Sequence, residues 1–330
     1  MTKIKIIVII ITVYITVFAQ NYKIGDEICS FAIKINDYLV NCRFDKAYEL
    51  SDELLKKNPD EPLFYYLSLA SIGLKSLDYD EIQDREKFNK IYVKGIAKIN
   101  SMLKNEPNNC DLLMIKGFLI SSNAAYSLID GKYAVGINDG ARSLDILKSA
   151  YNCDTANFDV QYYLGFYNYA QAELRRRLGI LFWLPKNAGD GIAALEKCVK
   201  NARFMNHAAE MVLADVYIRE NKPEKTNEML PKLLKKYPES RFLLWTKMRY
   251  EFALKDDLAA MKTAVFASRL YFRDGVFHNG IMILKEAKKI MNTRRFPKEI
   301  RDDIAKLEDK IDKNNISNSD IRTFNSLLKE

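Results

Sequence analysis

The stretch HAAEMVLADVYIRENKPEKTNEMLPKLLKKYP, residues 207–238, sets the fold expected of this chain. Its first half places small and apolar side chains three and four residues apart, at Leu213, Ala214 and Tyr217. Its second half repeats this spacing at Thr226, Leu230 and Leu233 before Pro238. Such spacing puts the side chains on one face of an α-helix. The stretch therefore predicts two helices, over 206–220 and 223–237.

The pattern of the first of these helices occurs three more times in the chain. EMVLADVYIR (210–219) aligns with FYYLSLASIG (64–73), LLMIKGFLIS (112–121) and VQYYLGFYNY (160–169). Each segment has a small residue near its middle, and these lie 49, 48 and 49 residues apart: Ser68, Gly117, Gly165 and Ala214. Glycine costs about 1 kcal/mol inside a helix, and close approach by a second helix offsets that cost. The chain is therefore predicted to consist of repeated helix pairs.

Matching boundaries precede three of these segments: LKKNPDEP (55–62), LKNEPNN (103–109) and SAYNCDT (149–155). Proline ends a helix, and Asn, Asp or Ser caps the next one. The predicted helix pairs are 25–40 with 44–58, 62–76 with 80–105, 110–130 with 133–151, 157–178 with 188–201, 206–220 with 223–237, and 240–255 with 257–271. Residues 274–293 and 297–313 are predicted to be closing helices.

The spacing in 207–238 resembles the tetratricopeptide repeat, a helix–turn–helix unit of about 34 residues. Three of its core positions follow the small residue by twelve, sixteen and nineteen residues, and a proline closes the unit. Residues 44–59 resemble the second helix of this repeat, and YYLGFY at 162–167 resembles the first. The resemblance implies an all-α, right-handed α-solenoid of tetratricopeptide-like helix pairs over about 24–270. The period near 48 requires longer helices or internal loops in several units.

The first 19 residues predict an export signal. Lys3 and Lys5 precede an uncharged run of 13 residues, IIVIIITVYITVF at 6–18. This run is shorter than the roughly 20 residues that cross a bilayer, and Val17 and Ala19 suit cleavage before Gln20. An uncleaved N-terminal anchor is the alternative. The expected division is a signal at 1–19, a helical array at 20–271, and a cap and tail at 272–330. The expected location is the periplasm or cell envelope, with outer-membrane association or secretion also open.

The resemblance also implies which residues face the concave side of the array. The positions that match the family's exposed concave face are mostly apolar or aromatic: Tyr65, Leu69, Ile72, Met114, Phe118, Tyr162, Phe166, Tyr169, Met211, Asp215 and Ile218. Such a groove suits an amphipathic helix or extended segment of a protein or peptide partner. The alternative is that these side chains pack inside the array. The Lys, Asn and Arg of the family's carboxylate-clamp members are absent, so an acidic C-terminal peptide is not expected.

An apolar segment interrupts one predicted pair. RRRLGILFWLPK at 175–186 has Leu181, Phe182 and Trp183 where a short polar turn is expected. Exposed apolar groups often mark a contact with a partner, and flanking Arg and Lys suit a membrane surface. We expect the triplet to be a contact site, for a partner or for a membrane surface on which the chain would be a peripheral protein. A loop that plugs the repeat core is the alternative.

Nothing in the sequence indicates catalysis. There is no GxSxG, HExxH, CxxC or phosphate-binding glycine motif, and the two histidines, His207 and His278, stand alone as surface or capping residues. The net charge of +8 comes from 51 basic and 43 acidic residues that interleave, so nucleic acid is not an expected partner. We therefore expect a scaffold that is not an enzyme and uses no cofactor or metal.

The cysteines leave two interpretations open. There are five, at positions 29, 42, 110, 153 and 198. Either all are buried or idle thiols, or one disulfide forms, with Cys110 and Cys153 as the best pair because both were placed near helix starts.

Overall fold

The computed structural model describes residues 22–178 and 187–290. Within these ranges the secondary structure is helical, with no strand. The helices in chain order are α2 (Asp26–Val40), α3 (Phe44–Lys57), α4 (Pro62–Tyr79), α5 (Arg85–Asn105), α6 (Cys110–Ile129), α7 (Tyr133–Cys153), α8 (Val160–Leu178), α9 (Gly189–Asn201), α10 (Asn206–Arg219), α11 (Pro223–Lys236), α12 (Arg241–Ala253), α13 (Asp257–Arg273) and α14 (Phe277–Ile290). The prediction of an all-α array of stacked helix pairs is confirmed.

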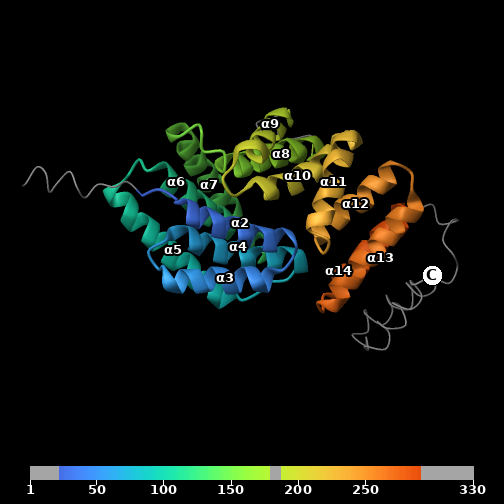
Figure 1. Cartoon of the computed structure of the whole chain (residues 1–330), viewed down its shortest axis with the longest axis horizontal. Coiled ribbons are helices and arrows are strands. Elements are labelled where there is room, and N and C mark those ends of the chain that lie inside the picture. The colour runs from blue at the N-terminus through green and yellow to red at the C-terminus, as the bar shows by residue number, and fades with distance from the viewer. Residues whose placement is uncertain (1–21, 179–186, 291–330) are drawn as a thin grey trace, which may run out of the picture.

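Consecutive helices pack on one another along the chain, as Figure 1 shows. Several helices start close to the predicted boundaries, and two of these starts have residues that favour the beginning of a helix. Asn109 accepts a hydrogen bond from the Leu112 amide at 3.0 Å and begins α6, and Pro62 begins α4. The predicted helix over 80–105 starts instead at Arg85, because Asp80 and Asp84 both have left-handed backbone angles, with φ of 51° and 48°.

The repeated small residues lie where a second helix comes close. A Cβ added at Gly117 would meet Leu147 of α7 at 2.5 Å, and one at Gly165 would meet the Gly191 carbonyl oxygen of α9 at 2.8 Å. Ser68 differs, since its hydroxyl lies 3.1 Å from that of Ser51 on α3, in the preceding pair. In these three positions the small residue lies at a contact between helices, but the neighbouring helix is not always the second helix of the same pair.

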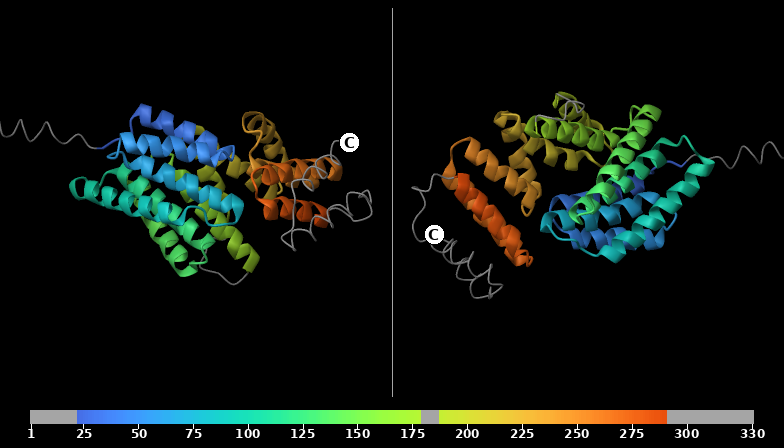
Figure 2. Two further views of the ribbon diagram at one scale, coloured as in Figure 1. Left: turned by 90° about the horizontal axis from the view of Figure 1, so that it is seen from below. Right: turned by 180° about the vertical axis from the view of Figure 1, so that it is seen from behind.

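The array also folds back on itself. In an open solenoid each repeat contacts only its neighbours, whereas here α2 packs against α10. The amide of Asn36 on α2 donates to the Phe204 carbonyl at 2.8 Å. Figures 1 and 2 show the yellow and orange helices turned back towards the blue ones. The first helix pairs and the last ones therefore enclose a common interior.

A buried ion pair joins the two ends of this curve. Arg241 on α12 has no exposed surface, and its Nε donates to the Asp78 carboxylate of α4 at 2.8 Å. Its Nη1 reaches Asp274 at 2.5 Å. The Tyr271 hydroxyl donates to Asp78 at 3.2 Å. These contacts fix α4 against the segment from α12 to α14.

The cysteines divide into one disulfide and three thiols. Cys110 and Cys153 are bonded, with their Cα atoms 5.6 Å apart. Cys153 ends α7 rather than lying near a helix start, and the bond forms because α6 and α7 run antiparallel. Cys29, Cys42 and Cys198 are buried thiols. Burial raises the pKa of all three, that of Cys42 to about 12, so they stay protonated and weakly nucleophilic.

Helix α6 is long and apolar enough, by length and composition alone, to cross a membrane. However, 67% of its most apolar stretch is buried inside the protein, which is the behaviour of a core helix. The predicted export signal, the closing helix at 297–313, and the triplet Leu181, Phe182 and Trp183 lie outside the described residues.

Candidate functional site

A cavity of about 620 Å³ lies inside the curve of the array. Its walls come from α2, α4, α6, α8, α10 and α12, together with Met205 at the start of α10. These are the first helices of the pairs, and the second helices contribute no lining residue. The repeat therefore gives the molecule an inner layer of helices that surrounds the cavity and an outer layer that supports it.

The walls are mainly apolar. Large side chains from several helices line the cavity: Leu39, Val40, Leu69, Leu74, Leu77, Phe166, Leu174, Met211, Val212 and Phe242. Three of them keep much of their surface open, with exposed fractions of 49% for Leu77, 45% for Phe166 and 45% for Leu174. Open apolar surface in a concave site is the usual feature of a ligand pocket.

Six of the predicted concave-face residues line this cavity: Leu69, Tyr162, Phe166, Tyr169, Met211 and Asp215. Whether they contact a partner stays a prediction.

The other predicted concave-face residues in the first two segments belong to the core instead. Met114 and Phe118 have no exposed surface. Tyr65 is buried against Gly95, and its hydroxyl donates to the Pro59 carbonyl at 3.1 Å; Ile72 is buried as well. These four side chains thus follow the alternative of packing inside the array, and in α4 the cavity is lined by the next residues along the chain, Tyr66 and Gly73.

Two tyrosines that the sequence did not single out form the wall in front of Phe118. The Phe118 ring lies 5.0 Å from the Tyr66 ring and 4.7 Å from the Tyr163 ring, measured between centroids. The Tyr66 and Tyr163 hydroxyls are 3.3 Å apart and share a hydrogen bond. Burial raises the pKa of both phenols, so this pair stays neutral. The only feature of the sequence that could have indicated this pair is the occurrence of two consecutive tyrosines in each segment, at 65–66 and 162–163.

Several other polar side chains of the apolar wall are also bonded within the protein. Ser122 Oγ donates to the Phe118 carbonyl at 3.0 Å, and Thr246 Oγ1 donates to the Phe242 carbonyl at 3.0 Å. The Asn36 amide is bonded to Phe204, as described above. This part of the cavity consequently offers few free hydrogen-bonding groups to a ligand.

One end of the cavity is charged. Arg177 Nε donates to Glu173 at 2.7 Å, and Arg219 Nε donates to Asp215 at 2.6 Å. Arg249 Nη2 lies 2.6 Å from the other oxygen of Asp215. All five residues line the cavity, so three guanidinium groups face two carboxylates there. Of the five, Asp215 was predicted for the concave face, and Arg177 was predicted only as part of the contact segment 175–186. Arg219 was not predicted, although it is spaced four residues from Asp215 on one helix face.

Arg249 is the least neutralised of these arginines. Burial lowers its pKa and Arg219 repels its charge, while Asp215 alone offsets these effects. Its Nε is buried and has no hydrogen-bond partner among the described residues. A cation in this state favours the approach of another anion.

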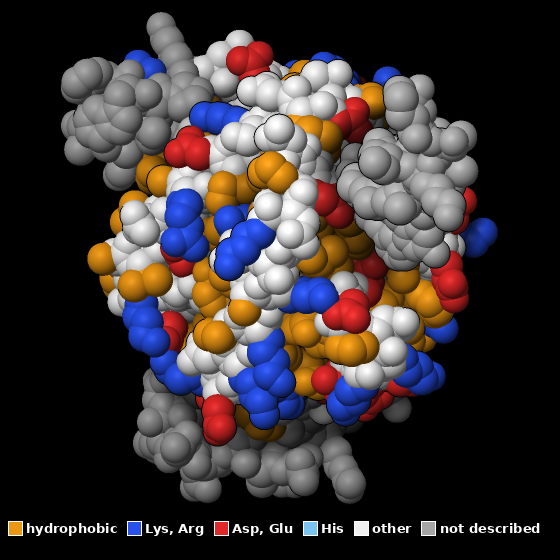
Figure 3. Space-filling model, turned by 90° about the vertical axis from the view of Figure 1, so that its left-hand side faces the viewer, with side chains coloured by type: hydrophobic (Ala, Val, Ile, Leu, Met, Phe, Trp, Pro, Cys, Tyr) orange, Lys and Arg blue, Asp and Glu red, His pale blue; other side chains and the backbone are white. Residues whose placement is uncertain are grey.

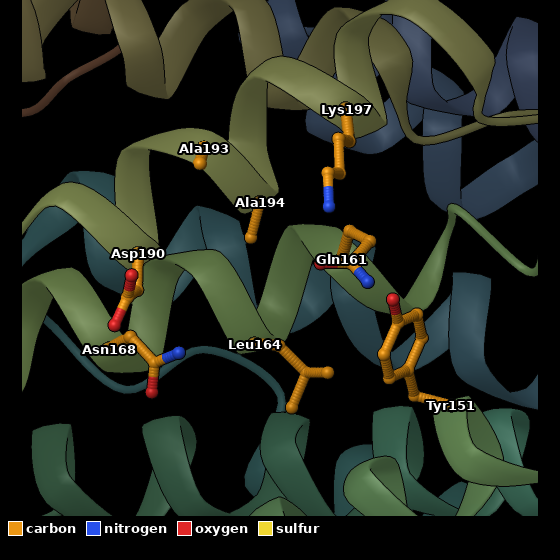
Figure 4. Close-up of a pocket in the computed structure, with 8 residues that line it drawn as sticks. All are labelled: Tyr151, Gln161, Leu164, Asn168, Asp190, Ala193, Ala194 and Lys197. Carbon is orange, nitrogen blue, oxygen red and sulfur yellow. The ribbon is translucent and has the colours of Figure 1, made fainter. Parts of the chain in front are cut away.

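A second, smaller pocket of about 290 Å³ lies between α8 and α9. Figure 4 shows Lys197 pointing toward Gln161, with Asp190 beside Asn168 and Tyr151 at the other end. Its lining has no histidine, cysteine or serine, so it holds none of the usual nucleophile and base pairs. Across the described ranges, no group of three or more His, Cys, Asp or Glu side chains could hold a metal ion.

The face of the molecule at the left of Figure 1 carries mixed charges. Figure 3 shows blue and red side chains next to one another there, with hydrophobic side chains in the recesses between them. A nucleic-acid surface would present a continuous basic stripe, which this face does not show.

Comparison with known proteins gives no family. No protein-family model matches the chain, and no curated protein matches it. Among solved structures, the human IFIT1 dimer with PPP-AAAA is similar over 75% of this chain and 69% of that chain, with a TM-score of 0.38 and 12% sequence identity. A likeness of this degree supports no statement about ligand or activity.

Proposed function

We propose that this chain is a non-catalytic binding protein and that the inner cavity is its binding site. The observation that carries the proposal is the open apolar surface of Leu77, Phe166 and Leu174 on the inner layer of helices. Burying a side chain of this size is worth about 1.5–3 kcal/mol. A ligand that covers these groups gains that free energy on binding.

The proposal includes the location and the kind of partner expected from the sequence. The charged start and short apolar run of residues 1–19 support export, and the Cys110–Cys153 disulfide supports an oxidising compartment. The partner expected from the repeat resemblance is a protein or peptide of the cell envelope. No cofactor is part of the proposal.

Four reactive side chains among the described residues are buried or held in a structural contact. The three free thiols are buried. His207 Nδ1 lies 3.0 Å from the Asp37 carboxylate, so it bridges α10 and α2 rather than serving as a surface or capping residue. This use of the reactive side chains supports a binding role over an enzymatic one.

Site-specific photo-crosslinking tests the proposal. A photoreactive amino acid is placed at Phe166 in the cavity and, as the control, at Val93 on the outer helix α5, where the exposed fraction is 64%. After irradiation of intact cells, mass spectrometry of the purified chain should show adducts at position 166 and not at 93. Adducts at neither position, or equally at both, would contradict a binding site in the cavity.

A further inference from the structure

We infer that the occupant of the cavity is a free long-chain carboxylate, with its apolar chain along the inner wall and its head group at Arg177, Arg219 and Arg249. This inference rests on the proposed function, because it takes the cavity to be the binding site. For the cavity it replaces the protein or peptide partner expected from the repeat resemblance with one chemical class, a single-chain amphiphile with one negative charge.

The size of the cavity favours a small ligand. Small-molecule sites typically enclose about 300–1,000 Å³, and this cavity of about 620 Å³ lies inside that range. A partner helix is about 10 Å across and rises ~5.4 Å per turn, so little more than one turn would fit. A single turn gives a protein partner few anchoring side chains.

The hydrogen bonding of the wall favours a chain without polar groups. An extended peptide brings one N–H and one C=O per residue, and each is costly to bury without a partner. Two of the wall hydroxyls that could donate to such groups already donate to backbone carbonyls, Ser122 to Phe118 and Thr246 to Phe242. A hydrocarbon chain brings no such groups, so it fits the wall as it stands.

The charged end favours an anionic head group. Three arginines there face the carboxylates of Glu173 and Asp215, and one further negative charge balances the set. Arginines near helix C-termini also offset the helix dipole, and this explains the presence of Arg177 and Arg219 in the last turns of α8 and α10. It does not account for the buried Nε of Arg249, which lacks a partner among the described residues. A carboxylate is the acceptor that guanidinium groups bind most strongly.

Binding of the fluorescent long-chain acid cis-parinarate to the full chain, and its displacement, tests the inference. We expect cis-parinarate to bind saturably and palmitate to displace it. Palmityl alcohol should displace it about tenfold less well than palmitate, because the alcohol lacks the negative charge. Arg249→Met should weaken binding about tenfold, and Arg219→Met provides a second variant should the first fold poorly. The control Arg142→Met changes an arginine on α7 that does not line the cavity and should bind normally.

A blocking variant tests the location. Ala170 on α8 is exposed and lines the cavity, so Ala170→Trp should fill it and abolish binding. Ala97→Trp, at an exposed position on α5 outside the cavity, should have no effect.

Equal displacement by the acid and the alcohol, or normal binding by Ala170→Trp, would overturn the inference, and so would failure of cis-parinarate to bind. Protein adducts at position 166 without any fatty-acid binding would leave the proposed function standing and reject only the carboxylate. Absence of any adduct at position 166 would reject the proposed function itself.

Discussion

Asp37 is held in its charged form by three donors from the opposite end of the curve. His207 Nδ1 lies 3.0 Å from its carboxylate and Lys236 Nζ lies 3.2 Å away, while the Tyr237 hydroxyl donates to the same oxygen. Burial by itself would raise the pKa of Asp37, but these hydrogen bonds outweigh it and hold the pKa at about 2. The sequence separation of these residues left no local pattern from which the cluster could be predicted.

This pKa predicts a contribution to stability that acid removes. Because the folded-state pKa lies below the ordinary 3.8, the contribution is fully present above about pH 4 and is lost as the pH falls toward 2. We expect Asp37→Asn to lower the free energy of unfolding by about 1–2 kcal/mol at pH 7, with the difference from the unmodified chain shrinking below pH 4. Urea unfolding at a series of pH values measures this.

Asp45→Asn is the matched control for this experiment. Asp45 forms an exposed ion pair with Lys75, with 74% of the Asp45 side chain accessible. Exposed pairs contribute less than about 1 kcal/mol. A pH-independent loss for Asp37→Asn would show that the carboxylate is not the source of the effect.

At the scale of the helix pair, the approach of α8 to α9 depends on two glycines. A Cβ at Gly165 would lie 2.8 Å from the Gly191 carbonyl oxygen and 2.8 Å from Leu195. A Cβ at Gly191 would lie 2.7 Å from the Tyr169 amide nitrogen. Since backbone atoms form these contacts, the helices have to move apart to accept a methyl group.

We therefore expect Gly165→Ala to destabilise the chain by about 1–3 kcal/mol, although alanine is the better helix former. Thermal unfolding followed by circular dichroism measures the change. Gly140→Ala is the control, since a Cβ there meets only the Tyr167 hydroxyl at 3.9 Å; it should be neutral or stabilising by up to about 1 kcal/mol. Equal effects at the two positions would refute the close-approach explanation.

The helices and their pairing could be predicted because they depend on neighbours in sequence. Apolar residues spaced three and four apart predicted the buried faces of the helices, and the small residues at intervals of 48 and 49 predicted that the helices form repeated pairs. Gly191 was missed because it has no counterpart in the repeat. The charged end of the cavity was missed for another reason: Arg177, Arg219 and Arg249 lie on three different helices and meet only when the array curves.

For the whole molecule, closure of the array depends on Arg241. Removing one partner of a buried ion pair leaves an uncompensated charge and typically costs about 3–5 kcal/mol. We expect Arg241→Met to destabilise the chain by this amount, because Asp78 would remain buried. Chemical denaturation measures the loss.

Two further variants separate closure from a general loss of charge. Lys57→Met removes an exposed pair with Glu53, whose partners have 65% and 60% of their side-chain surface accessible, and should leave the free energy of unfolding nearly unchanged. Adding Asp78→Leu to Arg241→Met removes the buried carboxylate that has lost its arginine partner and should restore part of the stability. No recovery in the double variant would argue against the ion pair as the cause.

The backward curve of the array also bears on the order in which the chain acquires its structure. The contact between Asn36 and Phe204 spans 168 residues, and that between Asp78 and Arg241 spans 163. During synthesis from the N-terminus, α2 and α4 leave the ribosome long before the helices that cover them exist. Contacts this distant in sequence slow folding and leave apolar surface exposed in the interim. The early helices are therefore the part of the chain most open to aggregation until α10 and α12 have been made.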